Sequence, residues 1–118
     1  MLDYRLTAQE AFALAQLHGL VSLEGWQAVL PKVAGALVET AAPPRLVIDM
    51  TAVLGYLGTP ERRQVGALLA MHFRQIEKVA IVVQAHKITD VVSSEAQRNG
   101  LTLRLFPEHD DAVAWVSA

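Results

Sequence analysis

The strongest constraint on the fold of this chain comes from two short, almost continuous apolar runs. They occupy residues 45–50 and 79–84, and polar and apolar residues do not alternate regularly in either of them. A strand with one face in water alternates with a period of two, whereas a strand buried on both faces has no such need. Parallel sheets covered by helices bury both faces of their central strands. The two runs therefore predict the centre of a mostly parallel sheet.

A long helix is predicted before the first of these runs. Ser22 is its expected N-cap, because a serine oxygen can accept from the free amides of the first turn. Apolar residues then recur at spacings of three and four, at Leu23, Trp26, Leu30, Val33 and Leu37. Pro31 cannot donate to the carbonyl of Gln27, so we expect a kink or a break there.

Two more helices are predicted on either side of the second run. Thr59 is the expected N-cap of the first of them, and a proline and an acid follow it in the first turn. The other is expected from about residue 87 to residue 98, and Asn99 with Gly100 is a typical end signal. Its inward-facing residues are predicted to be Ile88, Val91, Val92 and Ala96.

The remaining segments complete an α/β fold. Residues 4–7 and 12–18 predict a hairpin, and residues 101–106 alternate as an edge strand does. A last short helix is expected to open near Glu108 and to dock on the sheet through Ala112, Trp115 and Val116. The order is β-β-α-β-α-β-α-β-α, which favours a mostly parallel mixed sheet packed against helices. We expect residues 1–118 to form one domain.

Composition excludes several classes of function. The 118 residues carry ten basic and twelve acidic side chains without a basic stripe, so we expect no nucleic-acid partner. With no cysteine there is no disulfide, thiolate zinc site or thiol nucleophile. The first residues lack the pattern of a signal peptide, and the apolar stretches are too short to span a bilayer. We therefore expect a cytoplasmic protein.

Four segments between about Phe12 and Val116 share one pattern of side-chain classes. They are residues 18–22 with Trp26, residues 46–51, residues 76–83, and Leu105 and Phe106 with residues 112–115. In this pattern the chain resembles the SpoIIAA-like branch of the STAS superfamily, to which anti-sigma-factor antagonists belong. The resemblance implies the STAS fold and a regulatory or binding module rather than a reaction. Some SpoIIAA-like proteins are compared with SEC14-type lipid-binding domains.

In anti-sigma-factor antagonists a loop with an Asp-Ser-Ser-Gly pattern carries a serine that a partner kinase phosphorylates. The corresponding stretch here is residues 55–60, and Thr59 falls near that serine. The aspartate before it and the glycine after it are missing. The resemblance thus implies Thr59 as a phosphoacceptor, while its predicted capping role explains the threonine without any phosphate.

The carboxyl ends of parallel strands are where open α/β sheets bind ligands. The candidate contact residues gathered there are Asp49, Thr51, Gly55, Tyr56, Leu57, Gly58, His86 and Lys87. Asp49 and Thr51 also suit a purely structural role, because their side chains commonly bond to nearby backbone amides. Tyr56 and Leu57 are apolar residues in a loop, which is typical of a contact surface.

Motifs for catalysis or for metal binding are missing. His86 and Asp90 are four residues apart, so one helical face would hold both, but no third ligand follows at a metal-site spacing. Ser93 and Ser94 lie in a predicted helix without the Gly-x-Ser-x-Gly pattern of a hydrolase. We expect no metal, no cofactor and no enzymatic activity.

Two functions remain open from the sequence. One is an interaction module that contacts a protein partner through the loop 55–59 and the following helix. The alternative is a carrier or sensor of a small apolar or anionic ligand, which would require a pocket of about 300 Å³ or more. The apolar composition and the loop residues Tyr56 and Leu57 also lead us to expect a homodimer.

Overall fold

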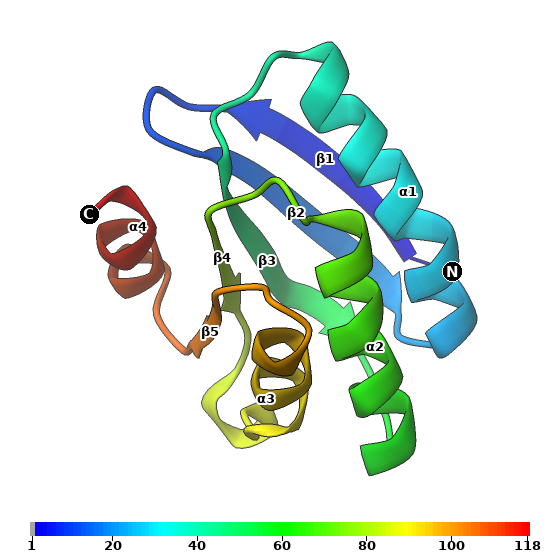
Figure 1. Cartoon of the computed structure of the whole chain (residues 1–118). Coiled ribbons are helices and arrows are strands. Elements are labelled where there is room, and N and C mark those ends of the chain that lie inside the picture. The colour runs from blue at the N-terminus through cyan, green and yellow to red at the C-terminus, as the bar shows by residue number, and fades with distance from the viewer. Residues whose placement is uncertain (1) are drawn as a thin grey trace.

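The computed structural model describes residues 2–118, and its elements follow the predicted order (Figure 1). They are β1 (Leu2–Ala8), β2 (Ala13–Leu20), α1 (Leu23–Glu39), β3 (Arg45–Leu54), α2 (Thr59–His72), β4 (Lys78–Val82), the 3₁₀ helix η1 (Ala85–Lys87), α3 (Val91–Arg98), β5 (Leu103–Phe106) and α4 (His109–Ser117). Within residues 2–118, no helix combines the length and the apolar character that a bilayer crossing requires.

The five strands form one mixed sheet in the order β1-β2-β3-β4-β5. β1 and β2 pair antiparallel as the predicted hairpin, and the three remaining neighbours pair parallel. Helices α1, α2 and α3 lie on one side of this sheet and α4 lies on the other (Figure 1). The predicted α/β class, with its mostly parallel mixed sheet, is confirmed.

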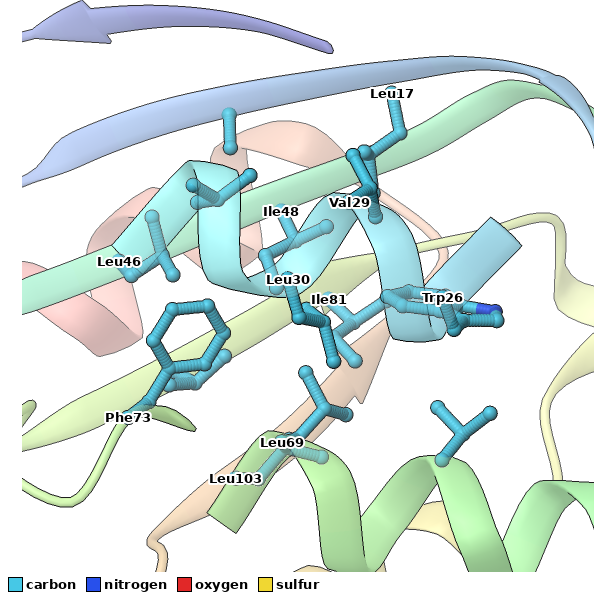
Figure 2. Close-up of a cluster of buried hydrophobic side chains, with 14 of the residues drawn as sticks. Leu17, Trp26, Val29, Leu30, Leu46, Ile48, Leu69, Phe73, Ile81 and Leu103 are labelled. Atoms are coloured by element: carbon cyan, nitrogen blue, oxygen red, sulfur yellow. The ribbon is translucent and has the colours of Figure 1, made fainter. Parts of the chain in front are cut away.

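Two apolar cores explain the two unbroken runs in the sequence. The larger core lies between the sheet and helices α1 to α3, and Figure 2 shows its centre around Leu17, Trp26, Val29, Leu30, Leu46, Ile48, Leu69, Phe73, Ile81 and Leu103. The smaller core lies under α4 and comprises Val47, Ala80, Val82, Phe106, Ala112 and Val116. Successive residues along β3, and likewise along β4, thus enter opposite cores, so the residues on both faces of these strands must be apolar.

Helix α1 begins as predicted and continues through its proline. The Ser22 hydroxyl oxygen accepts from the Gly25 amide at 2.9 Å, which confirms the N-cap. The expected break at Pro31 is wrong, since the helix is continuous from Leu23 to Glu39. Pro31 and Gln27 both lie on the exposed side. The carbonyl that the proline leaves without a helical donor is therefore on the side of the helix that water reaches.

Helix α2 begins one residue earlier than its predicted cap requires. The first helical hydrogen bond runs from the Arg62 amide to the Gly58 carbonyl at 3.0 Å, so Gly58 is the N-cap and Thr59 is the first helical residue. No side chain caps this end. The predicted capping role of Thr59 is wrong, because Gly58 occupies the N-cap position from which a side chain could accept.

The third predicted helix is shorter than expected. Residues 85–87 form a separate 3₁₀ turn, Ile88 is extended, and α3 begins only at Val91. Its end at Asn99 is as predicted. Strand β5 also begins two residues late, because the Leu101 amide donates to the Ala96 carbonyl at 3.0 Å and so belongs to the end of α3.

Candidate functional site

Contacts at the carboxyl ends of β3 and β4 hold several of the predicted site residues together. The Gln84 side-chain amide donates to the Thr51 carbonyl at 2.8 Å, and Lys87 Nζ donates to the Val53 carbonyl at 3.2 Å. The ring of Tyr56 has His86 edge-on, with 6.2 Å between ring centroids, and Lys87 Nζ lies 5.2 Å from its centroid. The 3₁₀ turn η1 therefore orders the start of the loop 55–59.

Asp49 and Thr51 have the structural role that their residue types suggest. Asp49 Oδ1 accepts from the Thr51 amide at 2.9 Å and from the Thr51 hydroxyl at 2.7 Å. Neither residue lines the pocket under the loop. The structure therefore gives this pair a local hydrogen-bonding role within β3, apart from the pocket.

A small apolar pocket of about 80 Å³ lies under the loop, between the sheet and the helices. Its lining combines loop residues with the end of the core and comprises Val21, Trp26, Met50, Val53, Gly55, Tyr56, Leu57, Arg62, Val65, Ile81, Val83, Lys87, Val92 and Leu105. Arg62 and Lys87 are its charged members, and within residues 2–118 neither of them forms an ion pair. The pocket is thus apolar inside and basic at its border.

Three large apolar side chains are exposed around the loop, and we call them the apolar rim. They are Leu20, Leu54 and Tyr56, which are 61%, 67% and 64% exposed. Leu20 and Leu54 lie opposite each other in neighbouring strands. Between Leu54 and Tyr56, Gly55 has φ +97, and a side chain there would approach Val21 Cγ1 to 3.1 Å. The tight turn at this glycine brings the rim residues together.

Sequence reasoning missed part of this surface. Leu20 and Leu54 lie beyond the strands expected from residues 12–18 and 45–50, and Arg62 is not among the candidate contact residues. Only the pairing of β2 with β3 shows that the two leucines are neighbours. The spacing of Arg62 to Thr59, which is one helical turn, is the one signal that connects the arginine to the predicted loop.

Thr59 and His86 lie at the outside of the site. Thr59 is exposed in the first turn of α2 and has no capping bond, so its hydroxyl faces solvent. His86 belongs to η1 and Asp90 is the N-cap of α3, so the two do not share a helical face as expected. Within residues 2–118 there is no group of three or more side chains arranged to hold a metal ion.

Comparison with known proteins identifies the fold. No protein-family model and no curated protein sequence matches this chain. The crystal structure of an anti-sigma factor antagonist from Mycobacterium paratuberculosis aligns over 100% of this chain and 96% of its own, with a TM-score of 0.67 and 21% identity.

An uncharacterised protein of the DUF3478 family from Shewanella loihica, described as having a SpoIIAA-like fold, aligns over 98% of this chain and 93% of its own. The TM-score is 0.61 and the identity is 16%. Both alignments span the hairpin, the parallel strands and all the helices. The chain therefore has the SpoIIAA-like fold, which is also that of the anti-sigma factor antagonist.

Proposed function

We propose that this chain is a non-catalytic cytoplasmic regulatory module that binds a protein partner through the loop 55–59 and helix α2. The observation that carries this proposal is the apolar rim, in which three large side chains remain in water around an ordered loop. Exposed apolar side chains gathered in one place are typical of protein contact sites. The structural similarity to an anti-sigma factor antagonist supports the same class of function.

The size of the pocket supports a contact site over a carrier site. Pockets that hold small molecules have volumes of about 300 to 1,000 Å³, whereas the pocket under the loop has about 80 Å³. That space suits one inserted side chain. An apolar anchor that fills a small pocket is a common centre of a protein interface.

The charges around the pocket define the chemistry of the partner. Arg62 and Lys87 border it, and Arg63 is exposed on the next position of α2. A partner that places an apolar side chain in the pocket and a carboxylate beside it would satisfy both features. We therefore propose an acidic partner segment with one apolar anchor.

Thr59 is the proposed point of regulation. It is the first residue of α2, directly after the loop, and it is exposed. A phosphate there would add up to about two negative charges and would be tolerated at a helix N-terminus. Close to an acidic partner, the same charges would repel it. Phosphorylation of Thr59 is thus proposed to release the partner.

The test compares a double variant in the rim with a single control variant in partner capture from extract of the source cells. Leu54→Ser with Tyr56→Ser alters the rim, and Val38→Ser alters an apolar residue at the far end of α1 that is even more exposed, at 81%. We expect the rim variant to lose a partner that the wild type and Val38→Ser retain. Circular dichroism checks that all three proteins are folded.

Equal partner sets for the rim variant and the control would contradict the proposal. Native mass spectrometry of the wild type tests the carrier function separately. A small molecule retained at one copy per chain would favour the carrier over the contact site.

A further inference from the structure

The outer edge of β1 has no covering strand within residues 2–118. β1 is the first strand of the sheet and pairs only with β2. It has seven residues without a proline or a register shift. The opposite edge, β5, has only four residues and is followed by Pro107. β1 therefore presents the longer and more regular free edge, which is able to pair with another strand.

The hydrogen-bonding direction of β1 follows from its register with β2. The register of the hairpin is unbroken from the pair Leu2–Gly19 to the pair Ala8–Ala13. The Gln9 amide extends this ladder by donating to the Phe12 carbonyl at 2.8 Å. In an antiparallel pair, every second residue forms hydrogen bonds with the partner strand. Odd-numbered residues of β1 therefore bond to β2, and even-numbered ones face the free edge. In agreement with this, the Tyr4 amide donates to Asp3 Oδ1 at 2.8 Å instead of to a strand.

The side chains of β1 alternate between the two faces of the sheet. Leu2, Tyr4 and Leu6 pack toward the larger core beneath α1, and Tyr4 Oη lies 3.5 Å from the Lys32 carbonyl oxygen. Asp3 and Arg5 are exposed on the other face. A strand that pairs with this edge must match an apolar face and a face with one negative and one positive charge.

We infer that β1 pairs with β1 of a second copy of this chain, antiparallel and with Tyr4 opposite Tyr4. In this register Asp3 of each copy lies opposite Arg5 of the other, and Leu2 lies opposite Leu6. Opposite charges facing each other across a strand pair stabilise it, and like charges destabilise it. The edge is thus complementary to itself, which a two-fold dimer requires.

Neighbouring registers do not have this property. A shift that places Arg5 opposite Arg5 joins two positive charges, and a shift that places Asp3 opposite Asp3 joins two negative ones. A shift of only one residue would place the apolar side chains of one copy on the same face of the sheet as the charged side chains of the other. Charge and polarity therefore favour this register over its neighbours.

Asp3 has a different role in each state. In the single chain its carboxylate occupies the Tyr4 amide and lies 3.9 Å from His18 Nε2, with 72% of the side chain exposed. This contact protects the edge from unspecific pairing. In the dimer the Tyr4 amide donates to the Tyr4 carbonyl of the second copy. The carboxylate is then free to pair with Arg5 of that copy.

Cysteine crosslinking tests the register directly, because the chain has no cysteine of its own. In the proposed dimer the two Tyr4 positions form a hydrogen-bonded pair with Cα atoms about 5.5 Å apart, which suits a disulfide. In the same dimer the two Thr7 positions are offset by six residues along the strands, which separates them by about 20 Å. We expect Tyr4→Cys to form a disulfide dimer under mild oxidation and Thr7→Cys to remain a monomer.

Charge reversal provides an independent test that leaves the packing under α1 intact. Light scattering of the wild type is expected to rise with concentration toward twice the chain mass of 12.8 kDa. Asp3→Arg should stay at the mass of one chain, since it places two positive charges opposite each other. Asp3→Arg with Arg5→Asp should recover the dimer, because the opposite pairs are restored in reversed order.

Two results would overturn the inference. One is a wild-type mass that stays at one chain at all concentrations while Tyr4→Cys crosslinks no faster than Thr7→Cys. The other is a dimer that persists in Asp3→Arg, since self-association would then use another surface. Because Leu54→Ser with Tyr56→Ser leaves β1 unchanged, dimerisation and partner capture can fail independently of each other.

Discussion

At the scale of single residues, the loop before α2 shows how one backbone hydrogen bond changes the role of a side chain. Thr59 has the residue type of an N-cap, but the first helical bond reaches Gly58 and leaves the threonine inside the helix. The side chain of Glu61 lies close to Gly58, with Oε1 2.7 Å from the position of a Cβ there. Gly58 and Glu61 thus occupy the two ends of a capping box that lacks its hydroxyl.

This arrangement predicts that Thr59 and Gly58 respond differently to substitution. Thr59→Ala should change the free energy of unfolding by less than about 0.5 kcal/mol, because no capping bond is lost. Gly58→Ser should stabilise by about 0.5–1 kcal/mol, since it adds a capping hydroxyl and reduces the entropy of the unfolded chain. The flexible Glu61 carboxylate must turn away from the new Cβ, which it can do at the exposed start of the helix. Urea denaturation of both variants provides the measurement. A loss of about 1 kcal/mol in Thr59→Ala would restore the threonine as the cap.

At the scale of elements, helix packing decides what each helix tolerates. In α1 the buried residues occupy one side, and Pro31 lies on the other. In α2, by contrast, Gly66 lies on the buried side. A Cβ there would come within 2.7 Å of the Val92 carbonyl oxygen and 2.8 Å of Glu95 Cβ. α2 and α3 approach closely at this glycine. A proline on the exposed side of a helix and a glycine at a contact between two helices are therefore both compatible with regular helices.

The position of Pro31 predicts that its removal stabilises the protein. Pro31→Ala should raise the free energy of unfolding by about 1–2 kcal/mol. A helix-interior proline costs about 3 kcal/mol relative to alanine, and part of the gain is lost to the freer unfolded chain. Gly35→Ala is the matched control on the exposed side, because a Cβ there meets nothing within 4 Å. It should gain no more than about 1 kcal/mol.

Thermal or urea denaturation of the two variants distinguishes helix propensity from packing. A loss of stability in Pro31→Ala would show that the proline ring contributes contacts that outweigh the missing hydrogen bond. Equal gains in both variants would mean that the backbone at Gln27 has adapted fully to the proline.

At the scale of the whole molecule, the sheet separates two cores and its central strands serve both. β3 and β4 have helices on either face, while β1 has only α1 beside it and an open outer edge. The rim and its pocket lie at the carboxyl ends of the central strands, and the free edge of β1 lies at the border of the sheet. The two proposed surfaces thus belong to different parts of one scaffold.

Hydrogen exchange should follow this organisation. The amides of β3 and β4 around Val47 and Val82 are expected to exchange most slowly, since both residues are buried and both strands pair on two sides. The outward-facing amide of Leu6 should exchange faster at low protein concentration and slow down as the dimer forms, because it then donates to Leu2 of the second copy. Fast exchange in both central strands would contradict the fold.

The sequence predicted the fold class and the residues that gather at the carboxyl ends of the central strands, because both depend on local patterns. A strand with helices on both faces must be apolar throughout, so residues 45–50 and 79–84 revealed the centre of the sheet. The carboxyl ends of those strands then indicated the loop 55–59 with His86 and Lys87. Ser22 was identified as a cap because capping requires only a hydroxyl three residues before a free amide.

What only the tertiary structure decided depends on contacts between distant segments. The pairing of β2 with β3 shifts register between Gln16 and His18, so Val53 enters the same core as Ile48 although simple alternation would place them on opposite faces. After that shift Leu20 and Leu54 lie opposite each other, and both side chains are exposed to solvent. No local pattern encodes a register shift, because it arises from how two strands fit together. The rim and the volume of the pocket therefore depend on the tertiary structure and cannot be read from the sequence.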